Sequence, residues 1–113
     1  HVTDEERADI IADIVGHPQG MPTIEELDYM NPALSVDAIQ DHLQTLQRVD
    51  IVSQRTTDDH RQDEPDTFYE LTADARALFD RNGLFPEPAW QREYQAVEKT
   101  PRIRALEESP RPR

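Results

Sequence analysis

The sequence predicts a mainly α-helical domain that carries one two-stranded β-hairpin. Apolar residues recur at helical spacing in several stretches, most of which open on a Ser or Thr able to cap a helix. Two short runs rich in β-branched and aromatic residues, 51–57 and 67–71, are typical of strands. The chain has 113 residues, of which 35% are hydrophobic, so we expect one domain with a small core.

The first helix is expected to end near residue 16. Thr3 and Glu6 have the spacing of a capping box, in which each side chain accepts a hydrogen bond from a backbone N–H at the helix start. Gly16 and Pro18 disfavour further helix. The expected apolar face consists of Ile10, Ile11, Ile14 and Val15.

A second capping box opens the next helix, which should be short. Thr23 and Glu26 supply the box, and Leu27 and Met30 are placed to face the core. Asn31 precedes Pro32, and a residue before proline is pushed out of the α region, so the helix should end there.

The third helix is expected over residues 36–49, with Ser35 as its cap. Its apolar stripe has the spacing i, i+4, i+7, i+10 and consists of Ile39, Leu43, Leu46 and Val49. Its other face consists of Asp37, Gln40, Asp41, Gln44, Gln47 and Arg48. These side chains can hydrogen-bond base edges but carry little positive charge.

The hairpin strands are joined by residues 58–66, a polar stretch too long for a tight turn. Thr72 is placed to cap a fourth helix that Asn82-Gly83 closes, and its inward residues are expected to be Ala75, Leu78 and Phe79. A fifth helix is expected over about 88–99, residues 102–108 can add a further short turn, and the proline-containing end, 109–113, is expected to be disordered.

The order helix, helix, helix, strand, strand, helix, helix is that of a winged helix-turn-helix with an additional C-terminal helix. Helices two and three form the helix-turn-helix and the hairpin forms the wing. We therefore expect a DNA-binding domain over 1–85, a C-terminal dimerisation helix region over 86–108 and a tail over 109–113.

The segment 34–52 resembles the recognition-helix region of ArsR-, MarR- and PadR-type regulators. The residues that carry the resemblance are Leu34-Ser35, Ile39, His42-Leu43, Leu46 and Ile51-Val52, together with a closing wing strand at Phe68–Thr72. Many Asp and Glu, with a single Lys, resemble haloarchaeal members, in particular PadR-like regulators of the oxidative-stress response. The resemblance implies a homodimeric transcriptional regulator that binds double-stranded DNA.

Two sets of side chains are candidates for DNA contact. The recognition-helix set is Ser35, Val36, Asp37, Ala38, Gln40, Asp41, Gln44, Gln47 and Arg48, and the wing set is Arg55, Thr56, Thr57, His60 and Arg61. A solvated helix face and a wing whose arginines pair with its own acids are the alternatives. Asp37 and Asp41 suit the helix dipole, and a carboxylate there can also accept from a cytosine amine or hold a cation that bridges to phosphate.

A dimer interface is expected because one small chain offers little to cover the apolar faces of its first and fifth helices. The residues concerned are Ile10, Ile11, Ile14, Trp90, Tyr94 and Val97. A partner subunit would cover them, and two copies would match two DNA half-sites. The alternative is that the fifth helix folds back onto its own domain. His42 is expected to be a half-buried packing residue.

Composition excludes several classes of function. Without cysteine there is no disulfide or thiolate chemistry, and no phosphate-cradling glycine loop or nucleophile elbow is present, so we expect no enzyme, no cofactor and no metal site. No apolar run is long enough to cross a membrane, and we expect a cytoplasmic protein. The net charge of -12 suggests adaptation to high salt or an acidic partner surface.

Two other functions remain open from the sequence. An acidic winged helix can serve as a protein–protein interaction module, since the net charge of -12 gives no general attraction to phosphates. An effector-gated repressor is the other possibility, with a small-ligand pocket whose expected walls are Met21, Met30, Phe79 and Trp90.

Overall fold

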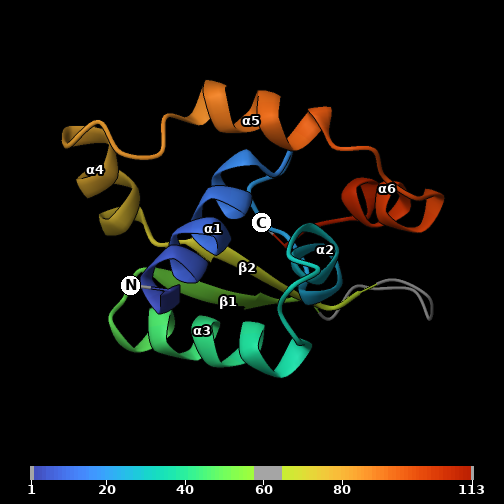
Figure 1. Ribbon diagram of the computed structural model, residues 1–113, viewed down its shortest axis with the longest axis horizontal. Coiled ribbons are helices and arrows are strands. Elements are labelled where there is room, and N and C mark those ends of the chain that lie inside the picture. Colours follow the sequence, from blue (N-terminus) through green and yellow to red (C-terminus); the bar gives the residue numbers. More distant parts are fainter. Residues whose placement is uncertain (1, 58–64, 113) are drawn as a thin grey trace.

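A computed structural model of the chain describes residues 2–57 and 65–112 (Figure 1). Within these residues the elements are α1 (Val2–Gly16), α2 (Ile24–Met30), α3 (Val36–Arg48), β1 (Val52–Thr56), β2 (Thr67–Leu71), α4 (Ala73–Arg81), α5 (Glu87–Ala96) and α6 (Pro101–Glu108). The predicted fold class, mainly α with a two-stranded β wing and helix added at the C-terminus, is confirmed. None of the described helices is both long and apolar enough to span a bilayer.

Strands β1 and β2 form an antiparallel pair that runs from Val52 opposite Leu71 to Thr56 opposite Thr67. Because side chains alternate along a strand, Val52, Tyr69 and Leu71 share the face that joins the main core. Phe68 lies on the reverse face and is fully buried there. Both faces of the sheet are therefore covered, one by the helices and the other by the C-terminal segment that contains Arg111.

The helix-turn-helix forms as its caps predict. The Thr23–Glu26 capping box is present at the start of α2, and Ser35 caps α3 by accepting from Ala38 N at 3.1 Å. Leu27 of α2 and Ile39 of α3 are fully buried in the main core, which also contains apolar residues of α1. Short polar caps and a few apolar side chains thus set the orientation of α3.

Three local expectations are wrong. The chain is already helical at Val2, so Thr3 lies inside α1 and does not cap it. Val49 is 59% exposed because α3 ends one residue earlier and Val49 becomes its C-cap. Leu78 is 49% exposed on α4, whose core contact is made through Ala75 and the Phe79–Phe85 ring pair.

Helix α5 lies along α1 of the same chain, which is the stated alternative to the expected dimer interface (Figure 1). Ile10, Ile11, Ile14 and Tyr94 are each at most 6% exposed within one chain, so the chain covers these side chains itself. Trp90 also packs against the core, and only Val97, at the end of α5, is substantially exposed at 39%. The helix folds back because the loop after α4 returns it across α1.

Gly16 permits this close approach. A Cβ built on Gly16 would lie 2.5 Å from the backbone oxygen of Trp90, well inside van der Waals contact. At the last residue of α1, only a residue without a side chain lets α5 pass. The apolar stripe on each helix was visible in the sequence, but this requirement was not.

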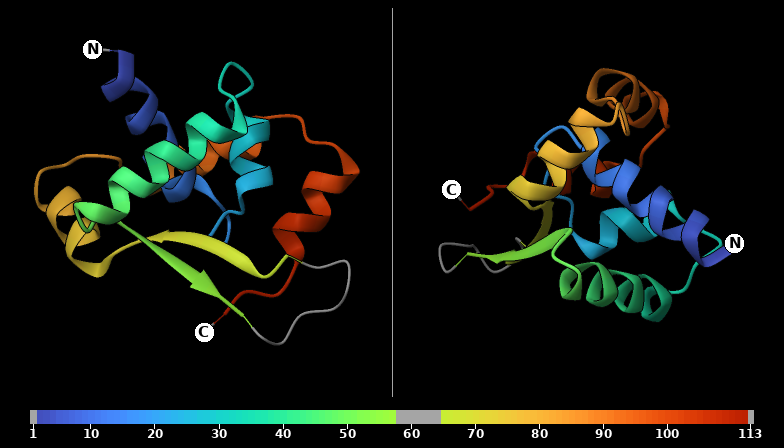
Figure 2. Two further views of the ribbon diagram at one scale, coloured as in Figure 1. Left: turned by 90° about the horizontal axis from the view of Figure 1, so that it is seen from below. Right: turned by 90° about the vertical axis from the view of Figure 1, so that its left-hand side faces the viewer.

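The C-terminal segment is ordered where disorder was expected. Ser109 and Arg111 make hydrogen bonds to α6 and to the loop before α2, so the expected disordered tail, 109–113, is wrong for residues 109–111. The Arg111 guanidinium lies 4.5 Å from the ring centroid of Phe68 and covers the reverse face of the sheet. Figure 2 shows this segment passing from α6 to a position beside the hairpin.

Candidate nucleic-acid interface

Helix α3 presents most of its predicted contact residues to solvent. Val36 is 42% exposed, and the side chains on the same outer surface are Asp37, Gln40, Asp41, Gln44 and Arg48. Ala38 and Gln47 are partly exposed at its margins. The opposite face is held by Ile39, Leu43 and Leu46, which are at most 4% exposed. The helix is thus anchored by one face and free to contact a ligand with the other.

Two rows of side chains run along the outer surface of α3. Residues four apart on a helix lie one above another, so Val36, Gln40 and Gln44 form an apolar and amide row. Asp37 and Asp41 form a second, acidic row beside it. Arg48, in the last turn, is the single cation on α3. The surface therefore offers amides and carboxylates in its first three turns and a positive charge only at its end.

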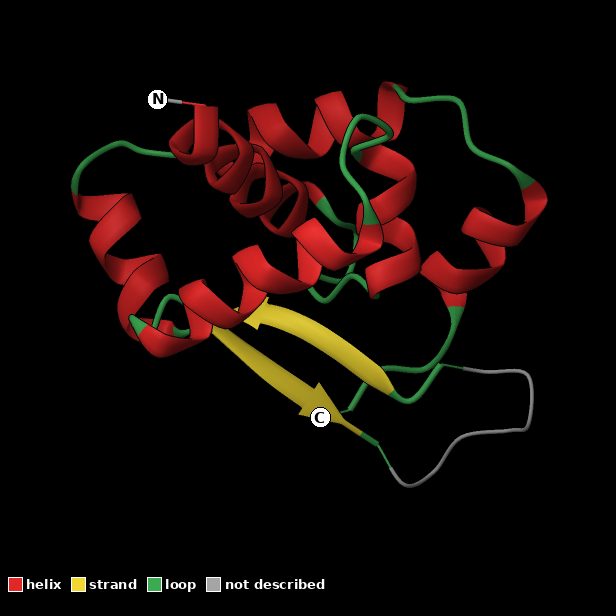
Figure 3. Cartoon of the chain, turned by 60° about the horizontal axis from the view of Figure 1, so that its bottom comes forward, coloured by secondary structure: helices red, strands yellow, loops and turns green. Residues whose placement is uncertain are grey.

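The amide row faces a small hollow between α3 and the hairpin, which we call the glutamine hollow. Its volume is about 240 Å³, and its lining residues are Gln40, Leu43, Gln44, Gln47, Gln54 and Tyr69. The side-chain nitrogen Nε2 of Gln47 donates to Oε1 of Gln54 at 3.4 Å. Burial raises the pKa of the Tyr69 phenol. Figure 3 shows α3 passing across the hairpin, whose strands supply Gln54 and Tyr69 to the lining.

Gln54 is a candidate contact residue that the sequence reasoning missed. It is exposed at the middle of β1, opposite Tyr69. Alternation along the strand places it on the same face as Val52, which is the face toward α3. That alternation was the available signal, and it separates Gln54 from Arg55.

The structure does not bring Arg55 together with the residues of α3. Arg55 lies on the reverse face of the hairpin, where its Nη1 is 2.7 Å from Oε1 of Glu70. Thr56 is exposed, and Thr57 is partly buried with its N–H bonded to the Asp66 carbonyl at 3.0 Å. His60 and Arg61, the remaining expected wing contacts, lie outside the described residues.

His42 joins the back of α3 to α1 and does not face the outer surface. Its Nε2 is 3.1 Å from Oε1 of Glu6, and its Nδ1 accepts from Nε of Arg7 at 3.2 Å. At 7% exposed it is more buried than the half-buried packing residue that was predicted. It positions α3 along α1.

A buried charged cluster holds the N-terminal end of α2. Glu26 is fully buried; its Oε2 bonds Nε2 of His17, and its Oε1 accepts from Nη2 of Arg111 at 3.0 Å. The Gln19 N–H donates to Nδ1 of His17 at 3.1 Å, so the imidazole proton is on Nε2 and points at Glu26. Burial lowers the pKa of Arg111, while the Glu26 carboxylate opposes that shift. The cluster joins Glu26 to His17, which lies 9 positions earlier in the chain, and to Arg111, which lies 85 positions later.

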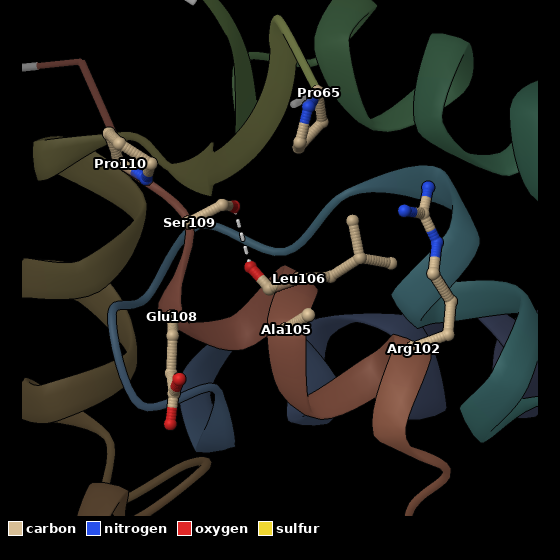
Figure 4. A pocket seen from close by; sticks show the side chains of 7 residues that line it. All are labelled: Pro65, Arg102, Ala105, Leu106, Glu108, Ser109 and Pro110. Atoms are coloured by element: carbon tan, nitrogen blue, oxygen red, sulfur yellow. Dashed lines mark hydrogen bonds between the residues drawn. The ribbon is translucent and has the colours of Figure 1, made fainter. Parts of the chain in front are cut away.

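A second hollow, of about 390 Å³, lies away from α3 between α6, the C-terminal segment and Pro65 (Figure 4). Ser109 Oγ donates to the Leu106 carbonyl at its edge, and Arg102 and Glu108 form part of its rim. None of the expected effector-pocket residues, Met21, Met30, Phe79 and Trp90, lines it. Among the described residues no group of three His, Asp or Glu is placed to hold a metal ion.

The comparisons with known proteins agree with this geometry. No family model matches the chain, and no curated protein matches it. Among solved structures, a protein from Halomicrobium mukohataei described as having a GntR superfamily winged-helix-turn-helix domain superposes with a TM-score of 0.84. The two are 30% identical over 96% of this chain and 78% of the other. The chain therefore belongs to the winged-helix-turn-helix proteins of the GntR superfamily.

Proposed function

We propose that the protein is a sequence-specific transcriptional regulator that binds double-stranded DNA as a homodimer. The observation that carries the proposal is the outer surface of α3. It leaves Gln40, Gln44 and Asp41 exposed on the second helix of a helix-turn-helix, directly beside the hairpin. In this arrangement the second helix enters the major groove and the wing reaches the adjacent minor groove.

The proposed homodimer must use a surface other than the contact between α1 and α5, because one chain buries that contact itself. Exposed apolar side chains remain at Val97, Leu78 and Leu84. Two copies would place two recognition helices about 34 Å apart along the duplex, one turn of DNA. Sedimentation equilibrium of the free protein and of its complex measures the number of chains directly.

The acidity of the protein supports an affinity for DNA that depends only weakly on the salt concentration. With a net charge of -12 and one cation on α3, few phosphate contacts can release counterions. Hydrogen bonds, shape and cations held between Asp37 or Asp41 and phosphate would then supply the affinity.

We expect the affinity for a specific duplex to fall with added salt less steeply than for a basic winged helix. A protein with 6 to 10 phosphate contacts loses roughly 10³- to 10⁵-fold between 50 and 200 mM salt, and the loss here should be far smaller. Mobility shifts over a KCl series measure the slope. A steep loss would contradict this binding mode. No duplex binding at any salt by the folded protein would favour a protein–protein interaction module.

Gln44→Ala should weaken specific binding by about 5- to 150-fold, which is the effect of losing one good base contact. Binding to random duplex should change little. Arg55→Ala, which leaves Glu70 without the cation 2.7 Å away, should weaken both kinds of binding. Fluorescence anisotropy with the two duplexes separates these effects. Equal losses for both variants on both DNAs would contradict base reading by Gln44.

The resemblance to PadR-like regulators supports oxidative-stress genes as the regulated set. Because the chain has no cysteine, a redox signal must act through methionine oxidation, an ion or an upstream partner. Mapping bound sites across the genome, with and without oxidant, tests this assignment.

A further inference from the structure

The glutamine hollow brings four carboxamides from two different elements to one place. Gln40, Gln44 and Gln47 come from α3 and Gln54 comes from β1. The hollow is floored by Leu43 and Tyr69, which are 1% and 8% exposed. These two buried side chains below the amides limit the directions in which the amides can turn, so their donors and acceptors face outward in a limited number of arrangements.

The chemistry of this surface matches adenine and not guanine. In the major groove adenine presents one acceptor and one donor, N7 and the N6 amine, which a carboxamide can bond together. Guanine presents two acceptors, and arginine or lysine is the usual partner. The first three turns of α3 contain no cation, and the neighbouring Asp37 and Asp41 would add acceptors facing the guanine acceptors. Val36, 42% exposed in the same row as Gln40, suits the methyl group of thymine.

Resting on the proposed function, we propose that the glutamine hollow selects adenine in the operator, and that Gln54 of the wing strand is a positioning residue for this selection. Gln54 acts through Gln47, since its Oε1 accepts from Nε2 of Gln47 at 3.4 Å. That hydrogen bond sets the orientation of the Gln47 amide. The specificity of the recognition helix is therefore set partly by a residue outside it.

The proposal is tested by selecting bound duplexes from a randomised library with the full-length protein. The wild type should enrich adenine at the positions read by the hollow, and adenine-to-guanine changes there should weaken binding by about 5- to 150-fold. Gln40→Glu keeps the side-chain shape but only accepts, so one adenine position should change to cytosine. The matched control is Gln95→Glu, the same change at an exposed position on α5, which should leave every preference unaltered.

Gln54 needs a separate readout, because a structural role alone would not alter base preference. Gln54→Ala should relax one selected position while unfolding free energy stays unchanged. Gln54→Glu retains the acceptor for Gln47 and should restore that preference. Guanine enriched at these positions, or a uniform loss of affinity with unchanged preferences in Gln40→Glu and Gln54→Ala, would overturn the proposal. Failure of the wild type to bind any duplex would instead contradict DNA binding itself, and the adenine assignment with it.

Discussion

Replacing Glu26 with alanine should lower the free energy of unfolding by about 3–5 kcal/mol, because it leaves the buried Arg111 charge without its partner. The Glu26 side chain is fully buried and also accepts from Thr23 N at 3.1 Å, so the capping box of α2 is lost as well. Domains of this size have a free energy of unfolding of about 5–15 kcal/mol. A measurable fraction of the variant molecules should therefore be unfolded. Urea unfolding followed by circular dichroism gives the value.

Glu25→Ala is the matched control for this prediction. Glu25 is the neighbouring acid, and its carboxylate pairs with Arg102 at 3.0 Å in a largely exposed bridge. Exposed bridges contribute about 0–1 kcal/mol, so the loss should be small. In a double-mutant cycle Glu26→Ala and Arg111→Ala should cost clearly less together than the sum of the two single changes. Additive costs, or equal costs for Glu25 and Glu26, would show that the buried cluster does not anchor the C-terminal segment.

Asp13→Asn should stabilise the protein at neutral pH and remove much of its pH dependence between about pH 4 and 7. Burial raises the pKa of Asp13 from 3.8 to about 7; the Asn31 hydrogen bond, at 2.8 Å, partly opposes this, and the Asp9 charge adds to it. Between those two pH values Asp13 is ionised in the unfolded chain, whereas it keeps its proton in the folded chain. Protonated Asp13 therefore makes its whole contribution to the stability of the fold below about pH 4. This contribution is lost as the pH rises to about 7.

The expected gain for Asp13→Asn at pH 8 is up to about 4 kcal/mol, the free-energy equivalent of that pKa difference. The amide keeps an oxygen for Asn31 and has no charge to desolvate. Urea midpoints at pH 4.5 and pH 8 should converge in the variant and differ in the wild type. Asp9→Asn, an exposed change one turn earlier, should leave most of the pH dependence in place. A variant less stable than wild type at pH 8 would show that the ionised Asp13 is stabilised in the fold.

The elements of the helix-turn-helix could be predicted because the signals for them are local. Thr23, Ser35 and Thr72 each cap a helix at the predicted position, and their bonds reach only three residues along the chain. Helical periodicity likewise placed Ile39, Leu43 and Leu46 inside. The failures at Thr3 and Val49 concern helix ends, where one residue more or less decides whether a side chain caps, packs or is exposed.

The candidate contact surface was predicted only in part. The exposed residues of α3 follow from its period, since the buried stripe leaves Gln40, Asp41 and Gln44 on the other side. The pairing of Arg55 with Glu70 and the meeting of Gln54 with Gln47 depend on strand register and on how the hairpin docks. Register and docking depend on contacts between distant residues, which periodicity does not report.

The sequence by itself determined the order of the first seven elements, the caps of α2, α3 and α4, and the side of α3 that faces water, because those properties arise from neighbours in the chain. The tertiary structure alone decided that α5 covers α1 of the same chain, which requires Gly16 to lack a side chain beside Trp90. It also decided that Arg111 closes the cluster of Glu26 and His17 from 85 residues away. A buried charge gains stability only when its partner is placed within hydrogen-bond distance, and that placement exists only in the folded chain.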